Sequence, residues 1–106
     1  MPRTPEQLWA TIAEPELARP EVTSGTGFGT NQGLRVRSKI FAMLVRGDLV
    51  VKLPKGRVDE LVASGVASRF DAGRGRLMKE WASVTPNAGR RWRALVAEAR
   101  AFVGSL

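Results

Sequence analysis

The fold depends first on residues 39–53, which read Lys39-Ile-Phe-Ala-Met-Leu-Val-Arg-Gly-Asp-Leu-Val-Val-Lys-Leu53. Two apolar runs rich in β-forming residues, Ile40–Val45 and Leu49–Leu53, flank the short connection Arg46-Gly47-Asp48. Glycine adopts the positive φ of a tight turn without a Cβ clash, so this arrangement predicts a β-hairpin with a short loop or a bulged turn.

Both faces of this hairpin are apolar. Side chains alternate between the two faces of a strand. A strand that is apolar on both faces is typical of the centre of a sheet, so we expect other elements to cover the hairpin from both sides. In its first strand, alternation places Phe41, Met43 and Val45 on one face and Ile40, Ala42 and Leu44 on the other.

Helices are predicted before and after this hairpin. Thr4-Pro5-Glu6-Gln7 has the pattern of a capping box that starts a helix, in which Trp9 is a core anchor. Pro54 opens a second helix, which Gly65 ends. Thr85 precedes a third helix with the apolar stripe of an amphipathic helix.

Shorter segments supply the other strands. They are Leu34–Arg37, Ser68–Asp71 and Leu77–Val84, the last with polar residues on both faces, which indicates a sheet edge or a bulge. We predict one small α+β domain over residues 1–106, in the order helix, strands, helix, strands, helix, with an antiparallel sheet of about five strands. The residues expected to share its core include Phe41, Leu61, Trp92 and Leu95.

A glycine-rich segment before the hairpin invites comparison with a phosphate-binding loop. Gly25, Gly27 and Gly29 fail the GxGxxG spacing, because Thr30 stands where the third glycine belongs. No Walker lysine follows, and the next segment is a predicted strand instead of a helix. We therefore expect a structural strand and turn, with Phe28 buried.

Length and composition are those of an ordinary soluble globular protein. The chain has 106 residues, of which 43% are hydrophobic and 25% charged. No apolar run approaches the ~20 residues of a membrane span. Met1-Pro2-Arg3 leads into a polar helix start and not into the apolar region of a signal peptide. We therefore expect a cytoplasmic protein with no membrane partner.

The sequence has no cysteine and no histidine, which excludes disulfides, thiol catalysis, Cys/His zinc sites and a histidine general base. Its acidic residues form no dense cluster such as an EF-hand loop. Lys79 with Glu80, or Asp71 with Arg74, could be arranged as an acid–base pair, but charged neighbours on a surface are far commoner. We predict a protein that is not an enzyme and has no catalytic residues, no metal site and no cofactor.

Charge is the strongest functional signal in the sequence. Lysine and arginine number 17 against 10 acidic residues, so the formal net charge is +7 and the pI is about 11.3. A small domain with this charge favours polyanions, with nucleic acid first. Two alternatives stay open. The charge can serve solubility alone, and the excess of arginine over lysine, 13 to 4, is typical of a GC-rich genome.

Three basic clusters are candidates for contact with nucleic-acid phosphates. The first of them shares one charged strand face if no bulge intervenes. No helix-turn-helix, RRM signature or zinc finger accompanies them, and the tryptophans fit core positions. We therefore expect weak binding that is largely independent of sequence. The clusters are Arg35, Arg37 and Lys39; Arg74, Arg76 and Lys79; and Arg90, Arg91 and Arg93.

A protein-interaction adaptor is the alternative function. A sheet with an exposed face or edge is a common docking surface for peptides. Leu77, Met78 and Trp81 lie near the expected edge. Burial of Trp81 in the core is the simpler interpretation, because large aromatic side chains are usually buried. The sequence leaves the partner and the oligomeric state open.

Several segments together carry a wider resemblance. They are Lys39-Ile-Phe-Ala-Met-Leu-Val, Leu49-Val-Val-Lys-Leu-Pro, Arg57-Val-Asp-Glu-Leu-Val-Ala-Ser-Gly, Arg69-Phe-Asp and Gly75-Arg-Leu-Met-Lys-Glu-Trp. Residues Gly33–Trp81 thereby resemble the YjbR/MmcQ-like family and the neighbouring TfoX/Sxy N-terminal-domain family. The resemblance implies a compact α+β domain with an antiparallel sheet packed by helices. It also implies a regulatory or DNA-binding role and supplies no catalytic residues.

Overall fold

The helices and strands follow the predicted order of helix, strands, helix, strands, helix. A computed structural model describes residues 3–26, 32–73 and 75–106 of the chain. The elements are α1 (Pro5–Leu17), β1 (Val22–Thr26), β2 (Gln32–Val36), β3 (Lys39–Val45), β4 (Asp48–Lys52), α2 (Lys55–Ala63), β5 (Ser68–Asp71), β6 (Leu77–Val84), the 3-10 helix η1 (Pro86–Arg91) and α3 (Trp92–Gly104).

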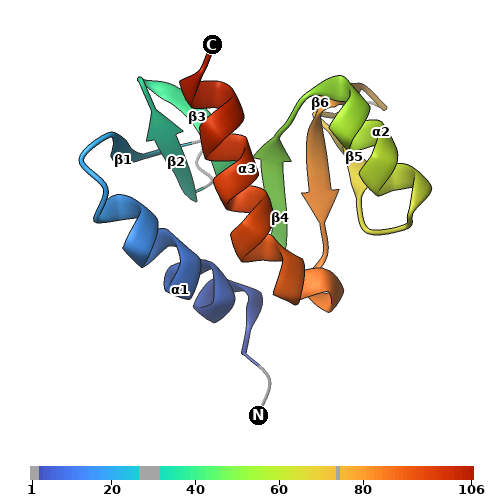
Figure 1. The fold of residues 1–106 in the computed structure, drawn as a ribbon. Coiled ribbons are helices and arrows are strands. Elements are labelled where there is room, and N and C mark those ends of the chain that lie inside the picture. Colours follow the sequence, from blue (N-terminus) through green and yellow to red (C-terminus); the bar gives the residue numbers. More distant parts are fainter. Residues whose placement is uncertain (1–2, 27–31, 74) are drawn as a thin grey trace.

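The strands form one antiparallel sheet in the order β1-β2-β3-β4-β6-β5. The α-helices lie on one face of this sheet, with α3 crossing it between α1 and α2 (Figure 1). The α+β prediction is confirmed. The sheet has six strands instead of about five, because the glycine-rich segment contributes β1. The predicted burial of Phe28 falls outside the described residues, as do Gly27, Gly29 and Thr30.

The larger core lies between the helices and the sheet. α3 contributes its apolar stripe, in which Trp92 and Leu95 are fully buried. Phe41 of β3 and Leu61 of α2 belong to the same cluster, as predicted. The indole Nε1 of Trp92 donates to the carbonyl oxygen of Thr85 at 3.2 Å. Apolar packing and this hydrogen bond together hold the start of α3 in place.

A bulge in β3 changes the face that Phe41 occupies. Leu34 pairs with Ala42 and Arg35 pairs with Ile40, so Phe41 has no residue directly opposite. Phe41 therefore joins Ala42 in the helix-covered core, while Ile40 packs with the cluster on the other face. The predicted alternation is wrong for Phe41 and Ile40, because the extra residue inverts the faces on one side of the bulge.

The face of the sheet without helices has a smaller buried cluster. Met43 and Val50 of the central hairpin pack there with Phe70 of β5 and Trp81 of β6. The pairing register between β5 and β6 changes between Arg69 and Asp71, the two neighbours of Phe70. The polar residues on both faces of β6 indicate a sheet edge or a bulge, and this register shift is such an irregularity. Bulged strands bend and twist more strongly than regular ones. The outer strands thus contribute apolar cover to the second face of the hairpin.

Two-residue turns connect β2 to β3 and β3 to β4. Arg37 and Ser38 form the first and Arg46 and Gly47 the second, and all four have positive φ, between 49° and 85°. Positive φ at both central residues is typical of the type I′ turn, whose twist matches that of the strands. The second turn is shorter than the predicted connection, because Asp48 already pairs with β3.

Local signals set the helix ends. The backbone N–H of Gln7 donates to Oγ1 of Thr4 at 3.1 Å, and the N–H of Thr4 donates to Oε1 of Gln7 at 2.9 Å, which is the predicted capping box. Gly65 follows α2 with a φ of +78°. The N–H of Val66 then donates to the carbonyl of Leu61 at 3.0 Å, as in a Schellman motif.

An ion pair between distant parts of the chain holds α1 against α3. Nη1 of Arg100 donates to Oε2 of Glu16. The Glu16 side chain is 12% exposed and that of Arg100 is 19% exposed, so both charges are largely removed from water. Burying the carboxylate of Glu16 without its cation would lower the stability of the fold, so the packing of α1 against α3 depends on Arg100.

We expect Leu95→Ala to lower the free energy of unfolding by about 2–5 kcal/mol, because it opens a cavity in the core. Denaturant melts followed by circular dichroism measure this change. Leu77→Ala is the matched control, since Leu77 is 60% exposed, and it should change stability by less than about 0.5 kcal/mol. Equal losses for the two variants would contradict the packing of α3.

We expect Arg100→Ala to lower the free energy of unfolding by about 3 kcal/mol, because it leaves the carboxylate of Glu16 buried without its main partner. Arg57→Ala serves as the comparison. It breaks an ion pair with Glu98 whose side chains are 30% and 40% exposed, so it should cost at most about 1 kcal/mol. An equal loss of unfolding free energy for Arg100→Ala and Arg57→Ala in the same melts would contradict the role of Arg100 in holding α1 against α3.

Candidate functional site

The antiparallel sheet brings several strand ends together. β3 starts at Lys39, β4 stops at Lys52 and β6 begins at Leu77. β3, β4 and β6 are neighbours that alternate in direction, so these three ends lie at the same end of the sheet, together with the β2–β3 turn. We call this region the basic end and define it by its cations, which are Arg37, Lys39, Lys52, Arg76 and Lys79.

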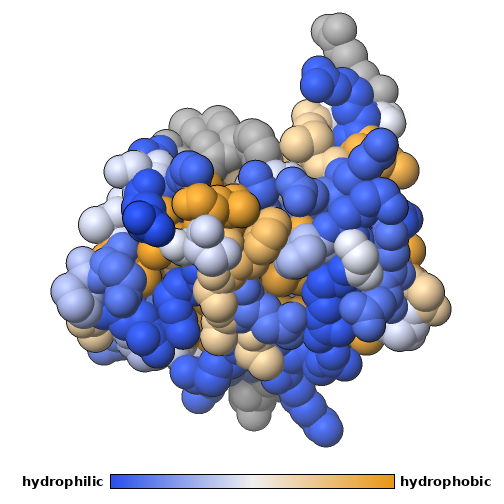
Figure 2. Space-filling view, turned by 45° about the horizontal axis from the view of Figure 1, so that its top comes forward, coloured by the Kyte–Doolittle hydropathy of each residue, from blue (hydrophilic) through white to orange (hydrophobic). Residues whose placement is uncertain are grey.

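Figure 2 brings this end of the molecule forward and shows hydrophilic side chains over most of it, with hydrophobic side chains gathered between them. Four of the five cations are exposed and Lys52 is half-buried. Within the part of the chain that the structure describes, none of the five forms an ion pair. The acidic residues near these five cations are Glu21, which precedes β1 and lies near Arg37, Asp71 at the end of β5, and Glu80 of β6. The local charge therefore remains positive.

Other basic side chains are neutralised by carboxylates. These pairs lie within a helix, between helices, between α1 and the residues that follow it, or between α2 and β5, and none of them includes a cation of the basic end. The net charge of +7 is for this reason not spread evenly over the molecule. The pairs are Arg19 and Arg100 with Glu16, Lys55 and Arg69 with Asp59, and Arg57 with Glu98.

Contacts hold two cations of the basic end in place. Arg37 lies in the β2–β3 turn and not in the predicted strand, and its Nη1 donates to the carbonyl oxygen of Gly104 at 2.9 Å. A cation at the carboxyl end of a helix such as α3 is favoured by the helix dipole.

Nζ of Lys52 lies 5.8 Å from the ring centroid of Trp81, a cation–π distance. Sequence reasoning missed Lys52, because its pairing with Trp81 requires knowledge of the strand order.

The two-residue β2–β3 turn separates two members of the first predicted cluster, Arg35 and Lys39. Lys39 pairs with Val36, whose side chain lies in the helix-covered core, whereas Arg35 pairs with Ile40 on the opposite face. Arg35 instead lies across Gly25, where its Nε occupies the space that a Cβ would need. The predicted face required one continuous strand from Arg35 to Lys39. Because the chain turns at Arg37 and Ser38, this face is not formed.

Sheet geometry also separates the other two predicted clusters. Arg76 and Lys79 of the second cluster lie at the basic end, whereas Arg74 lies outside the described residues. The third cluster follows the far end of β6, roughly 20 Å away along that strand. The members of the third cluster are all exposed, and they are Arg90, Arg91 and Arg93.

The predicted adaptor contact is only partly accessible. Leu77 is 60% exposed and Met78 is half-buried, but Trp81 is 7% exposed and packs in the cluster on the face without helices. The interpretation of Trp81 as a core residue is therefore confirmed. Of the three proposed contact residues, Leu77 alone is exposed.

A small polar cavity of about 170 Å³ lies beside the β3–β4 turn. Asp48, Ser68 and Ser83 supply polar groups to its wall, next to the apolar Val50 and Phe70. Burial raises the pKa of the Asp48 carboxyl above its ordinary value. The positive charge of Arg46 in the β3–β4 turn lowers this pKa, but by less than burial raises it. The cavity is too small for more than a few water molecules or a small ion.

Within residues 3–26, 32–73 and 75–106, no three acidic side chains come close enough together to hold a metal ion. No helix in these ranges has the length and apolarity needed to cross a membrane. No protein-family model and no curated protein matches the sequence. The fold and the site define a small two-layer α+β domain with a basic sheet end.

We expect Asp48 to titrate at higher pH than Asp59. Hydrogen bonds from Lys55 and then Arg69 lower the pKa of Asp59, whereas burial raises the pKa of Asp48. Asp48 therefore favours the folded state most below its unfolded pKa, and this contribution is lost as the pH rises through the folded pKa. Asp59 stabilises the folded state above its unfolded pKa, and this stabilisation is lost as the pH falls through its folded pKa. NMR titration of the two carboxyl groups measures the order, and a reversed order would contradict the two environments.

Proposed function

We propose that this protein is a small, non-enzymatic regulatory domain that binds nucleic acid through its basic end. The observation that carries this function is the gathering of five cations, without ion-pair partners among the described residues, where the ends of β3, β4 and β6 meet. Phosphate contacts need only accessible lysine or arginine side chains on one surface. Because five other basic side chains are already paired with carboxylates, the basic end is one of the regions where a polyanion gains most.

Binding through this surface should be weak and nearly independent of base sequence. Trp9, Trp81 and Trp92 are all buried, so none of the tryptophans is available to stack on bases. Sequence selectivity would need side chains that reach base edges in a groove, and the proposed contacts are to phosphates. Electrostatic attraction then supplies most of the affinity.

The resemblance of Gly33–Trp81 to the YjbR/MmcQ-like and TfoX/Sxy N-terminal-domain families supports the same function. An antiparallel sheet packed by helices is the fold that this resemblance implies, and it is the fold observed. Membership of one of these families and a cytoplasmic location are part of what we propose.

A protein-interaction adaptor is the second candidate. One observation favours it, namely that β1 and β5 are the outermost strands and each is paired on one side only. Unpaired strand edges can accept a further strand from a partner. This function does not exclude nucleic-acid binding, because the edges and the basic end are different surfaces.

Three exposed cations of the basic end provide the test, through the triple variant Lys39→Ala, Arg76→Ala and Lys79→Ala. The unmodified protein should bind duplex DNA with a log–log salt slope of about −0.9 for each phosphate neutralised. Loss of three phosphate contacts should flatten this slope by up to about 2.7 units. Anisotropy titrations of a labelled duplex at several salt concentrations measure the slope.

The matched control removes the same charge at the other end of the sheet, through Arg90→Ala, Arg91→Ala and Arg93→Ala. We expect this control to change the slope by less than about one unit. A larger change in the control than in the first variant would move the interface to the third cluster. Absence of binding at low salt would assign the cations to solubility, and a salt-insensitive, sequence-selective complex would also contradict the proposed contacts.

A further inference from the structure

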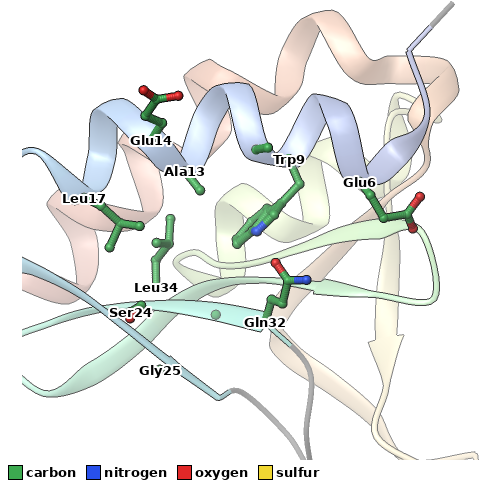
Figure 3. A pocket seen from close by; sticks show the side chains of 11 residues that line it. Glu6, Trp9, Ala13, Glu14, Leu17, Ser24, Gly25, Gln32 and Leu34 are labelled. Carbon is green, nitrogen blue, oxygen red and sulfur yellow. The ribbon is translucent and has the colours of Figure 1, made fainter.

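A groove of about 840 Å³ runs between α1 and the first two strands of the sheet (Figure 3). Its size is in the range of sites that hold a small molecule or a few side chains of a peptide. The described residues that line it include none of the cations of the basic end. A ligand in this groove would therefore be recognised by different groups from those that contact nucleic acid.

The inside of the groove is apolar. Figure 3 shows Trp9, Leu17 and Leu34 directed toward the space between α1 and the strands. Trp9 and Leu34 are buried, whereas Leu17 is 42% exposed. The short side chains of Ala10 and Ala13 leave room beside them. A partner that covers Leu17 gains the free energy of removing apolar surface from water.

The rim of the groove is acidic, although the protein as a whole is basic. Glu6 and Glu14 of α1 both line the groove, and neither forms an ion pair within the described residues. The carboxylate of Glu14 lies at the outer edge, on the side of α1 away from the strands (Figure 3). Among the residues that the structure places along the groove there is no lysine or arginine. The two glutamates attract a cationic ligand and repel the phosphates of a nucleic acid.

The strand side of the groove has an open edge. β1 is the outermost strand, so its backbone is paired only with β2. Ser24 and Gly25 of β1 line the groove, and neither carries a bulky side chain. An extended segment can add to such an edge by main-chain hydrogen bonds, and every second side chain of the segment then lies on the side of α1.

We propose that this groove binds an extended segment of a partner protein whose side chains facing α1 alternate between apolar and basic. The distance between the two charges is similar to the repeat distance of such a segment. Glu6 and Glu14 are roughly 12 Å apart along the helix axis, at about 1.5 Å per residue. Two basic residues four positions apart in a strand are roughly 13 Å apart, with one apolar residue between them on the same face.

A synthetic peptide tests this inference directly. The probe is fluorescein-labelled Leu-Thr-Lys-Thr-Leu-Thr-Lys-Thr-Leu, which places leucine and lysine on one face, and the comparison peptide has glutamate in place of lysine. Ala10→Arg puts a bulky cation into the groove at an exposed helical position. Ala63→Arg makes the same change at an exposed position of α2, outside the groove. We expect Ala10→Arg to weaken binding of the lysine peptide at least about tenfold, and Ala63→Arg less than about twofold.

The charge contribution has its own variant pair. Glu6→Gln with Glu14→Gln should weaken binding about threefold at low salt. Glu60→Gln with Glu80→Gln changes the net charge equally at exposed positions away from the groove and should have no comparable effect. If Ala10→Arg fails to fold in circular dichroism melts, the comparison of these two double variants still tests whether the groove binds the lysine peptide.

Four results would overturn the inference. They are no binding of the lysine peptide to the unmodified protein, equal binding of the glutamate peptide, equal binding by the Ala10→Arg and Ala63→Arg variants when both fold, and a dimer of the unmodified protein that Ala10→Arg abolishes. The last result would make a second copy of this chain the occupant. Chemical-shift changes at the amides of Ser24 and Gly25 on adding the lysine peptide would support strand addition at β1.

Discussion

The central hairpin of β3 and β4 is apolar on both faces, and the rest of the structure follows from the need to cover both. The helices cover one face, where Phe41 packs with Trp92 and Leu95. On the other face the sheet contributes its own cover, because Phe70 and Trp81 from the last two strands pack on Met43 and Val50. The register shift between β5 and β6 lies at Phe70, one of these covering side chains.

α3 connects the core to the charges of the surface. Its apolar stripe lies on the sheet, and its polar residues contact three different parts of the chain. Arg100 pairs with Glu16 of α1, Glu98 pairs with Arg57 of α2, and the carbonyl of Gly104 accepts from Arg37. The two ion pairs occupy the carboxylates of Glu16 and Glu98, and neither pair includes a cation of the basic end. The basic end and the cluster after β6 therefore retain their positive charge.

Local structure could be predicted from the sequence wherever a few neighbouring residues decide it. The capping box at Thr4, the helix end at Gly65 and the apolar stripe of α3 are cases in which residues within one or two helical turns suffice. The central hairpin belongs with them, because its pattern of apolar residues around Gly47 is continuous. The burial of Trp9, Trp81 and Trp92 also agrees with the expectation.

The positions that were predicted wrongly depend on contacts between distant residues. The bulge that turns Phe41 into the helix-covered core is set by pairing between β2 and β3, and nothing at Phe41 itself indicates it. Arg37 and Ser38 form a turn with positive φ without glycine or asparagine, so the usual turn signal is missing. The pair of Arg100 with Glu16 spans most of the chain. The grouping of basic residues likewise depends on the strand order, which places β6 next to β4.

The central functional claim is that the basic end, and not the cluster after β6, faces the nucleic acid. Backbone amide chemical shifts of the folded protein, recorded while a short DNA duplex is added at low salt, test it most directly. We expect the largest changes at Lys39, Lys52 and Lys79, with little change at Arg90 and Arg93. Changes centred on Arg90 and Arg93, or no changes at all, would contradict it.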